Sequence, residues 1–137
     1  MAHFIKENRH QIGLFILRFM VAASILASAG QKIFFPEVAF DQLNYVYGVA
    51  ELSLTELYFI GGAQAIIGVG VLTGASKRVF YLLALTMQIT FILGIGTEIT
   101  TELRLLNLTY FPYLITAAAT FTLYMTRDED TFLAIQK

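Results

Sequence analysis

Four long apolar stretches constrain the fold of this chain more than any other feature. They cover residues 12–30, 57–73, 79–96 and 105–125. Each has about the 17–25 residues that a helix needs to cross the hydrocarbon core of a bilayer. Too little of the chain remains to shield four such helices from water. The pattern therefore predicts an all-α integral membrane protein, a four-helix transmembrane bundle in which residues 1–137 form a single domain.

Composition supports this fold class and excludes several functions. Hydrophobic residues make up 57% of the chain and charged residues 14%, against about 45–50% and about 25% in ordinary soluble domains. The stretches are continuously apolar, whereas the strands of a membrane β-barrel alternate between apolar and polar residues. The absence of cysteine excludes thiol catalysis and cysteine-ligated metals. A net charge of −1 without a basic patch excludes nucleic-acid binding.

The distribution of basic residues predicts the orientation, because cytoplasmic loops carry an excess of Lys and Arg. Alternating the four spans leaves only Lys32 and Arg104 on one side of the membrane. Six basic residues then share the other side: Lys6, Arg9, Lys77, Arg78, Arg127 and Lys137. We therefore expect a multi-pass protein of the cell's inner (cytoplasmic) membrane, with both termini in the cytoplasm and residues 31–56 outside.

The connections between the spans carry their own helix signals. Apolar residues recur at helical spacing after Pro36, which predicts an amphipathic helix in the outer membrane interface. Ser53 and Glu56 match a capping box at the start of the second span. Gly74 suits the C-cap of that span, and Ser76 suits the N-cap of the next.

Glycine and proline residues shape the predicted helices. Gly61, Gly68 and Gly94 are small enough to let neighbouring helices approach closely. Pro112 lies inside the fourth stretch, where its ring and missing donor predict a kink about one turn upstream, near Leu108.

Arg18 is the most unusual residue of the apolar stretches. It lies ~9 Å from the cytoplasmic end of the first span, where an ionisable group is costly unless it finds a partner. No stretch has an acidic residue in its interior, so we expect Arg18 to have no counter-ion within the chain. It either snorkels to the inner headgroups or binds a carbonyl, water, a lipid phosphate, a bound anion, a quinone oxygen or an acid of another subunit. The C-terminal residues 127–135 are expected to pack on a partner or the membrane surface.

Three further polar side chains lie at similar depth in different spans. Counting along each helix places Gln64, Gln88 and Thr116 ~14–15 Å from the cytoplasmic side. They either bond the helices together or form a layer that faces a ligand. Lys32 follows Arg18 on the same helical face and also belongs to a rim of charges at the outer surface. The candidate ligand- or partner-binding residues are Arg18, Lys32, Gln64, Gln88 and Thr116; no catalytic or metal site is predicted.

The segment from Leu17-Arg18 to Lys32-Ile33-Phe34 resembles the opening of the DoxX-like family. The first helix of that family carries an arginine and ends in a glycine-x-lysine signature, here Gly30-Gln31-Lys32. The likeness continues through residues 61–74, which are rich in glycine, into the basic link Lys77-Arg78. Gln64 stands where the family favours a glutamate, which argues against a proton-carrying role at that position.

The resemblance implies a small four-helix membrane protein. Family members are associated with quinone-linked sulfur oxidation, redox-stress assemblies and metallophore-type biosynthesis, often beside a soluble partner. We predict an accessory or anchoring subunit of a quinone-linked membrane redox assembly, with lipids and other membrane or soluble redox subunits as partners. The alternatives are a quinone-binding oxidoreductase subunit with Arg18, Gln64 and Gln88 at its site, and a small-solute carrier acting as a homo-oligomer. The chain itself carries no cofactor signature, a bound quinone or lipid is the candidate ligand, and the chain alone is expected to turn over no substrate.

Overall fold

The computed structural model describes residues 8–49, 52–96, 100 and 110–135. Within these residues the chain is all-helical and contains no strand. The helices are α2 (Arg9–Phe34), α3 (Pro36–Tyr47), α4 (Leu54–Thr73), α5 (Lys77–Gly94) and α7 (Phe111–Met125). The predicted all-α class is therefore confirmed for the described part of the chain.

Three helices, α2, α4 and α5, are long and apolar enough to cross a membrane. They begin two or three residues before the predicted stretches at 12–30, 57–73 and 79–96. The fourth stretch, 105–125, differs. Its helix α7 has 15 residues, and positions 105–109 lie outside the described residues. A helix of that length rises only ~22 Å, against a hydrocarbon core of ~30 Å.

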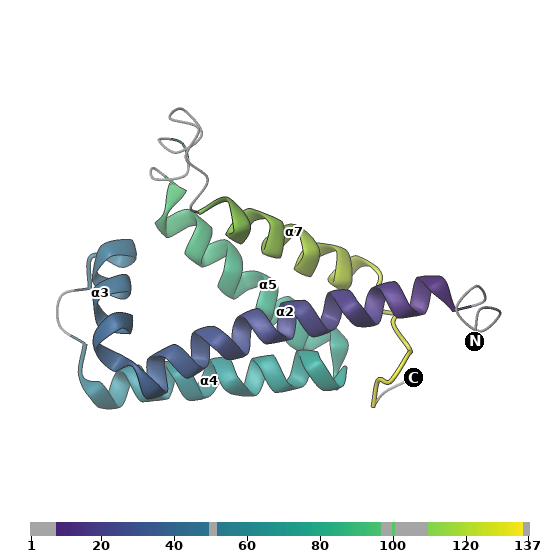
Figure 1. Cartoon of the computed structure of the whole chain (residues 1–137), viewed down its shortest axis with the longest axis horizontal. Helices are drawn as coiled ribbons and strands as arrows, with labels where there is room; N and C mark the ends of the chain where they lie inside the picture. The colour runs from purple at the N-terminus through teal and green to yellow at the C-terminus, as the bar shows by residue number, and fades with distance from the viewer. Residues whose placement is uncertain (1–7, 50–51, 97–99, 101–109, 136–137) are drawn as a thin grey trace.

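The helices form two pairs with α3 across one end (Figure 1). α2 packs along α4, and α5 packs on α7 at an angle to the first pair (Figure 1). α3 contacts α2, α4 and α5. Buried residues from four helices form the main core: Val21, Ala22, Ile25, Val71, Tyr81, Ala84 and Leu123. Large apolar side chains also cover the outside, including Met20, Phe59, Leu93 and Phe121, which is typical of a surface that faces lipid or a partner.

Glycines allow the closest helix contacts, as their small size predicts. A Cβ atom on Gly68 would lie 2.7 Å from the side chain of Leu26 on α2. One on Gly61 would lie 3.1 Å from side-chain atoms of the same helix. At the end of α5, a Cβ atom on Gly94 would lie 2.7 Å from Val46 of α3. These three positions therefore bring α4 against α2 and α5 against α3.

The predictions for the start and end of α4 and for the start of α5 are confirmed in part. Ser53 and Glu56 form the capping box, with the Glu56 backbone N–H donating to Ser53 Oγ at 3.2 Å. Gly74 ends α4 in the left-handed conformation, with φ of 66°. Ser76 directly precedes α5, as predicted, with φ of 38°. Its side chain makes no capping hydrogen bond, so that part of the prediction is wrong.

Proline marks the beginnings of α3 and α7. The predicted helix after Pro36 is confirmed as α3, and it ends before Gly48 in the left-handed conformation. Pro112 lies in the first turn of α7, where a missing backbone donor costs nothing. The kink predicted near Leu108 lies outside the described residues.

Candidate functional site

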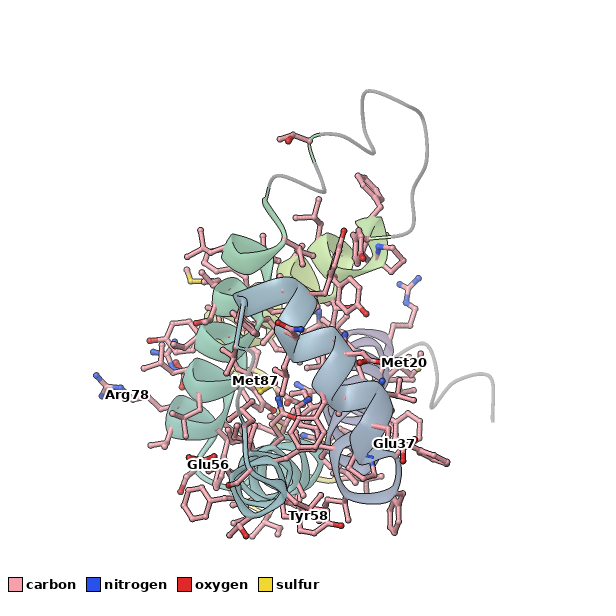
Figure 2. The ribbon with its side chains drawn as sticks, turned by 90° about the vertical axis from the view of Figure 1, so that its left-hand side faces the viewer. Met20, Glu37, Glu56, Tyr58, Arg78 and Met87 are labelled. Carbon is pink, nitrogen blue, oxygen red and sulfur yellow. The ribbon has the colours of Figure 1, made fainter. Side chains whose placement is uncertain are left out.

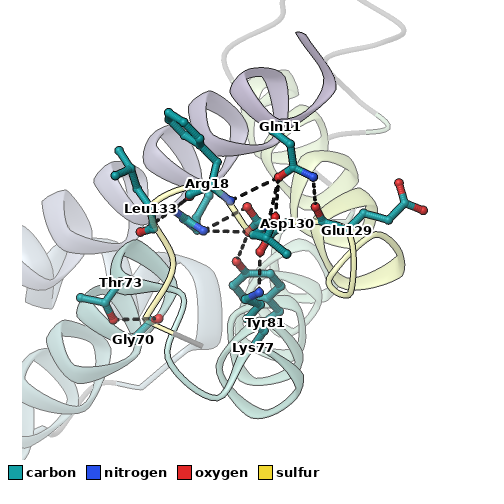
Figure 3. A network of polar contacts seen from close by, with 11 residues as sticks. Gln11, Arg18, Gly70, Thr73, Lys77, Tyr81, Glu129, Asp130 and Leu133 are labelled. Atoms are coloured by element: carbon teal, nitrogen blue, oxygen red, sulfur yellow. Dashed lines mark hydrogen bonds and ion pairs between the residues drawn. The ribbon is translucent and has the colours of Figure 1, made fainter. Parts of the chain in front are cut away.

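Arg18 is fully buried and has a counter-ion within the chain (Figure 3). Its Nη1 donates to both carboxylate oxygens of Asp130, each at 3.0 Å. Its Nη2 donates to the carbonyl oxygens of Phe132 at 2.7 Å and Leu133 at 3.1 Å. The expectation that Arg18 finds no acid in its own chain is therefore wrong. The acid comes from the C-terminal segment, not from another span.

Two residues of α5 complete what we call the Arg18–Asp130 cluster, made of Arg18, Lys77, Tyr81 and Asp130. The Tyr81 hydroxyl donates to Asp130 Oδ2 at 2.5 Å, and Lys77 Nζ donates to the backbone carbonyl of Asp130. Lys77 and Tyr81 lie one helical turn apart, so both side chains face the same residue. The Asp130 side chain has no exposed surface. The cluster thus ties α2 and α5 to the C-terminal segment.

The C-terminal segment, residues 126–135, packs on the chain's own helices. The Phe132 ring meets the Phe15 ring edge to face at 5.7 Å, and Gln11 Oε1 accepts from the Phe132 backbone N–H at 3.2 Å. The Ile135 backbone N–H donates to the Thr73 carbonyl at 3.0 Å. The segment therefore contacts its own helices, and its packing on a partner or the membrane surface stays a prediction. Phe132 packs against α2, and Ala134 lies beside Gly74 at the end of α4, whereas Leu133 and Ile135 are exposed.

Substituting Arg18 should separate charge from geometry. We expect Arg18→Ala to destabilise the protein by a few kcal/mol, roughly 3, and Arg18→Lys by clearly less. The lysine keeps the charge beside Asp130, but a single ammonium cannot reach the carboxylate and two carbonyls with the same planar fork. Thermal unfolding in detergent micelles, followed by circular dichroism, measures both changes. Equal and unaltered stability of the two variants would contradict this role for Arg18.

A separate cavity of about 700 Å³ lies among the five described helices. This volume is within the range of small-molecule sites, ~300–1,000 Å³. Figure 2 places one lining residue, Met87, among the helices near the centre of the molecule. The lining residues that matter below are Ser28 and Lys32 on α2, Tyr47 on α3, Gln64 on α4, Met87, Gln88 and Phe91 on α5, and Tyr113 and Thr116 on α7. The cavity is therefore built by residues far apart in the sequence.

A directional series of hydrogen bonds crosses the cavity from α2 to α5. Lys32 Nζ donates to Ser28 Oγ at 3.0 Å, and Ser28 Oγ donates to Gln64 Oε1 at 3.5 Å. Gln64 Nε2 then contacts the Met87 sulfur at 3.3 Å. Thioether sulfur is a weak acceptor, so the hydrogen bond that the Gln64 amide group donates to Met87 is weak. A stronger acceptor in the cavity could take this donor.

The opposite wall presents a second amide and several aromatic rings. Gln88 Oε1 lies 2.8 Å from the Thr120 hydroxyl, whose single proton also faces the Thr116 carbonyl at 2.8 Å, while Gln88 Nε2 is buried without a hydrogen-bond partner among the described residues. The rings of Phe91 and Tyr113 lie 4.7 Å apart, and those of Phe91 and Tyr47 lie 6.5 Å apart. A buried unpaired donor is costly. This wall therefore favours a ligand with an acceptor atom and a flat or apolar body.

The structure divides the predicted candidate residues into two groups. Lys32, Gln64, Gln88 and Thr116 all line the cavity, whereas Arg18 does not and belongs to the Arg18–Asp130 cluster. The placing of Lys32 in a solvated outer rim is wrong, because the residue is only 6% exposed.

Sequence reasoning missed several residues of both sites. Asp130 and Tyr81 were not predicted; a lone arginine in an apolar helix was a signal to search the chain for an acid. Ser28, Met87 and the aromatic wall carry no such signal, because serine, methionine and tyrosine are ordinary residues of apolar helices.

Comparison with known proteins adds no relative. Neither a protein-family model, nor a curated protein, nor a solved structure matches the chain. The fold and the site define a helical protein with an apolar exterior and a largely apolar cavity that carries several polar and aromatic side chains. Membership of the DoxX-like family stays a prediction.

Proposed function

We propose that the chain is a multi-pass protein of the inner membrane with four spans and both termini in the cytoplasm. The three long apolar helices and the apolar exterior support this placement. The basic residues Lys77 and Arg78 begin α5, and Arg127 follows the end of α7. The segment after α7 contacts the start of α2, where Glu129 meets His10. A cytoplasmic position of this end agrees with the positive-inside rule.

In this membrane, we propose, the protein binds a lipophilic molecule with an oxygen-bearing headgroup, of the quinone class, as a subunit of a redox assembly. The observation that carries the proposal is the cavity of about 700 Å³ with polar groups on opposing helices. Lys32 and the free amide donor of Gln88 offer hydrogen bonds to oxygen acceptors. Phe91 and Tyr113 offer aromatic surface for a flat ring.

An accessory role fits the chemistry that lines the cavity. Its polar side chains are one lysine, amides, hydroxyls and phenols, which bind and orient a ligand. The described residues include no group of three or more His, Cys, Asp or Glu that could hold a metal. Electrons would therefore pass between the bound ligand and a partner subunit. Quinone-dependent turnover by the isolated chain would contradict this accessory role.

Quinone binding is measurable through the protein's own fluorescence. The chain has seven tyrosines and no tryptophan, and Tyr47 and Tyr113 line the cavity. A short-chain quinone added to the protein in nonionic detergent should quench tyrosine emission saturably, with micromolar affinity. Organic extraction of the purified protein followed by mass spectrometry should also recover a lipophilic ligand.

Two substitutions on α7 form a matched control for this experiment. Thr116 and Thr122 each donate to the backbone carbonyl four residues earlier, at 2.9 Å, but only Thr116 lines the cavity. Thr116→Phe should fill part of the space and weaken quinone binding at least tenfold, whereas Thr122→Phe should leave it unchanged. Absence of saturable quenching, or equal binding by the two variants, would contradict the proposed site.

A further inference from the structure

Among the described residues that line the cavity, Lys32 is the one charged side chain. Although it stands in the last turn of α2, it is only 6% exposed. Its Nζ donates to Ser28 Oγ at 3.0 Å and to the Ser28 carbonyl at 3.4 Å. An ammonium has three protons to donate. One donor direction of Lys32 is therefore left for a group that enters the cavity.

The described residues provide no negative charge for this ammonium. Their ion pairs are His10–Glu129 and Arg18–Asp130, neither of which involves Lys32. The helices packed around Lys32 carry the acidic residues Glu37 and Asp41 on α3 and Glu56 on α4, all exposed and outside the cavity lining. The other titratable side chains in the lining are the phenols of Tyr47 and Tyr113. Lys32 thus differs from Arg18, which is also buried but is paired with Asp130.

Burying a cation without a counter-ion is unfavourable, and the penalty falls when an anion arrives. Ser28 cannot supply that charge, because its hydroxyl is neutral; it accepts from Lys32 and donates to Gln64. A negative headgroup beside Nζ would form an ion pair with Lys32. The side-chain amides of Gln64 and Gln88 would donate hydrogen bonds to the uncharged oxygens of the ligand. The apolar and aromatic part of the lining would hold the rest of the ligand.

We propose that the cavity selects ligands whose headgroup carries one negative charge on oxygen, and that Lys32 is the group that pairs with it. This inference rests on the proposed function and narrows its ligand class to oxyanions on an apolar body, such as an acidic hydroxyquinone or a lipid carboxylate. It makes charge, in addition to shape, a determinant of specificity. A neutral quinone would bind, but more weakly.

Two probes of nearly the same shape test the charge directly. 2-Hydroxy-1,4-naphthoquinone is ionised at neutral pH, whereas 2-methoxy-1,4-naphthoquinone is neutral. The unaltered protein in nonionic detergent should bind the hydroxy compound roughly ten- to a hundredfold more tightly, the range expected for one hydrogen bond between charged groups. Dodecanoate should compete more strongly than dodecanol for the same site. This pair tests a lipid carboxylate as the ligand, whereas the naphthoquinones test a quinone.

Substitution of Lys32 should remove the preference without removing the cavity. Lys32→Met should bind the two naphthoquinones with similar affinity, and Lys32→Arg should keep the preference for the anion. Arg78→Met is the control, because it removes one positive charge from an exposed position outside the cavity lining. The visible spectrum of the hydroxy compound adds an independent readout, since the bound ligand should stay ionised at a lower pH than the free ligand in unaltered protein but not in Lys32→Met.

The outcomes separate this inference from the proposed function. Equal affinity of the unaltered protein for the two naphthoquinones would overturn the charge selection and leave quinone binding in place. A preference that survives in Lys32→Met would overturn the role of Lys32. Failure of every probe to bind would overturn the proposed function as well. The comparison of probes in the unaltered protein holds even if Lys32→Met does not fold.

Discussion

Replacing Asp130 by alanine is expected to destabilise the protein by about 3–5 kcal/mol, the cost of leaving a buried charge without its partner. Arg18 has no exposed surface, and Asp130 provides its only carboxylate among the described residues. The guanidinium cannot escape by losing a proton, because arginine stays charged in proteins. The substitution also removes the acceptor of the Tyr81 hydroxyl. Unfolding in detergent micelles, by heat or by a denaturing detergent, measures the loss.

The same reasoning ranks Asp130→Ala above Arg18→Ala. When Arg18 is removed, the Asp130 carboxylate keeps the Tyr81 hydroxyl as a donor, whereas the Arg18 guanidinium without Asp130 keeps only two neutral carbonyl acceptors. Replacing both residues by apolar ones of similar volume, Arg18→Met with Asp130→Leu, should recover most of the stability, because no charge is then left buried. A double variant as unstable as Asp130→Ala would show that the carbonyl contacts of Arg18, not the ion pair, dominate.

Glu129 provides the matched control, since it is the adjacent acid and also forms an ion pair. Its carboxylate lies 2.7 Å from His10 Nε2, but both side chains are 62% exposed. Exposed pairs contribute about 0–1 kcal/mol, so Glu129→Ala should leave stability nearly unchanged. If Asp130→Ala and Glu129→Ala proved equally stable, the buried cluster would not hold the C-terminal segment in place.

The Arg18–Asp130 cluster also shows what could not be predicted from the sequence. The helices could be predicted because each apolar run encodes its own length, and the capping box and Gly74 encode local hydrogen bonds and backbone conformation. Arg18 and Asp130 are separated by 112 positions. A charged C-terminal run is usually solvated, so nothing local distinguishes Asp130 from Asp128 or Glu129. The pairing is decided by tertiary packing, in which the segment turns back against α2.

The cavity shows the same limit at a finer scale. Depth along a helix can be counted at ~1.5 Å per residue, which is why Gln64, Gln88 and Thr116 were expected at one level. Which face each residue occupies depends on helix rotation and packing, and Arg18 faces a different site from Lys32. The burial of Lys32 depends on tertiary packing, since α4 comes so close at Gly61 that a Cβ atom there would lie 3.1 Å from Lys32 Cβ. A residue count places Lys32 at the end of its span and so suggests an exposed rim.

Gly70→Ala should destabilise the protein although alanine is the better helix former. A Cβ atom at this position would lie 2.3 Å from Cδ1 and 2.4 Å from Cγ of Phe80, far inside van der Waals contact. Because Cγ is attached directly to the Phe80 Cβ, rotating the ring about its own axis cannot relieve the clash. The side chain must change χ1 or α5 must move away from α4. Overpacking of this kind costs about 1–3 kcal/mol, which exceeds the gain in helix propensity of ~1 kcal/mol.

Gly62→Ala in the same helix separates packing from propensity. Apart from the chain neighbours of Gly62 and the nearby backbone of its own helix, no described atom lies within 4 Å of a Cβ placed there. This substitution should therefore be neutral or stabilising by up to ~1 kcal/mol. Gly70→Ala should therefore unfold at a clearly lower temperature than Gly62→Ala, with both compared in the same detergent. Replacing Phe80 by alanine removes Cγ together with the ring, so Gly70→Ala should cost less stability in a Phe80→Ala background than in the unaltered protein, and a double-mutant cycle isolates that coupling. If Gly70→Ala were as stable as Gly62→Ala, α5 would not pack against α4 through Phe80, and the short link at residues 74–76 would have to hold the two helices in another arrangement.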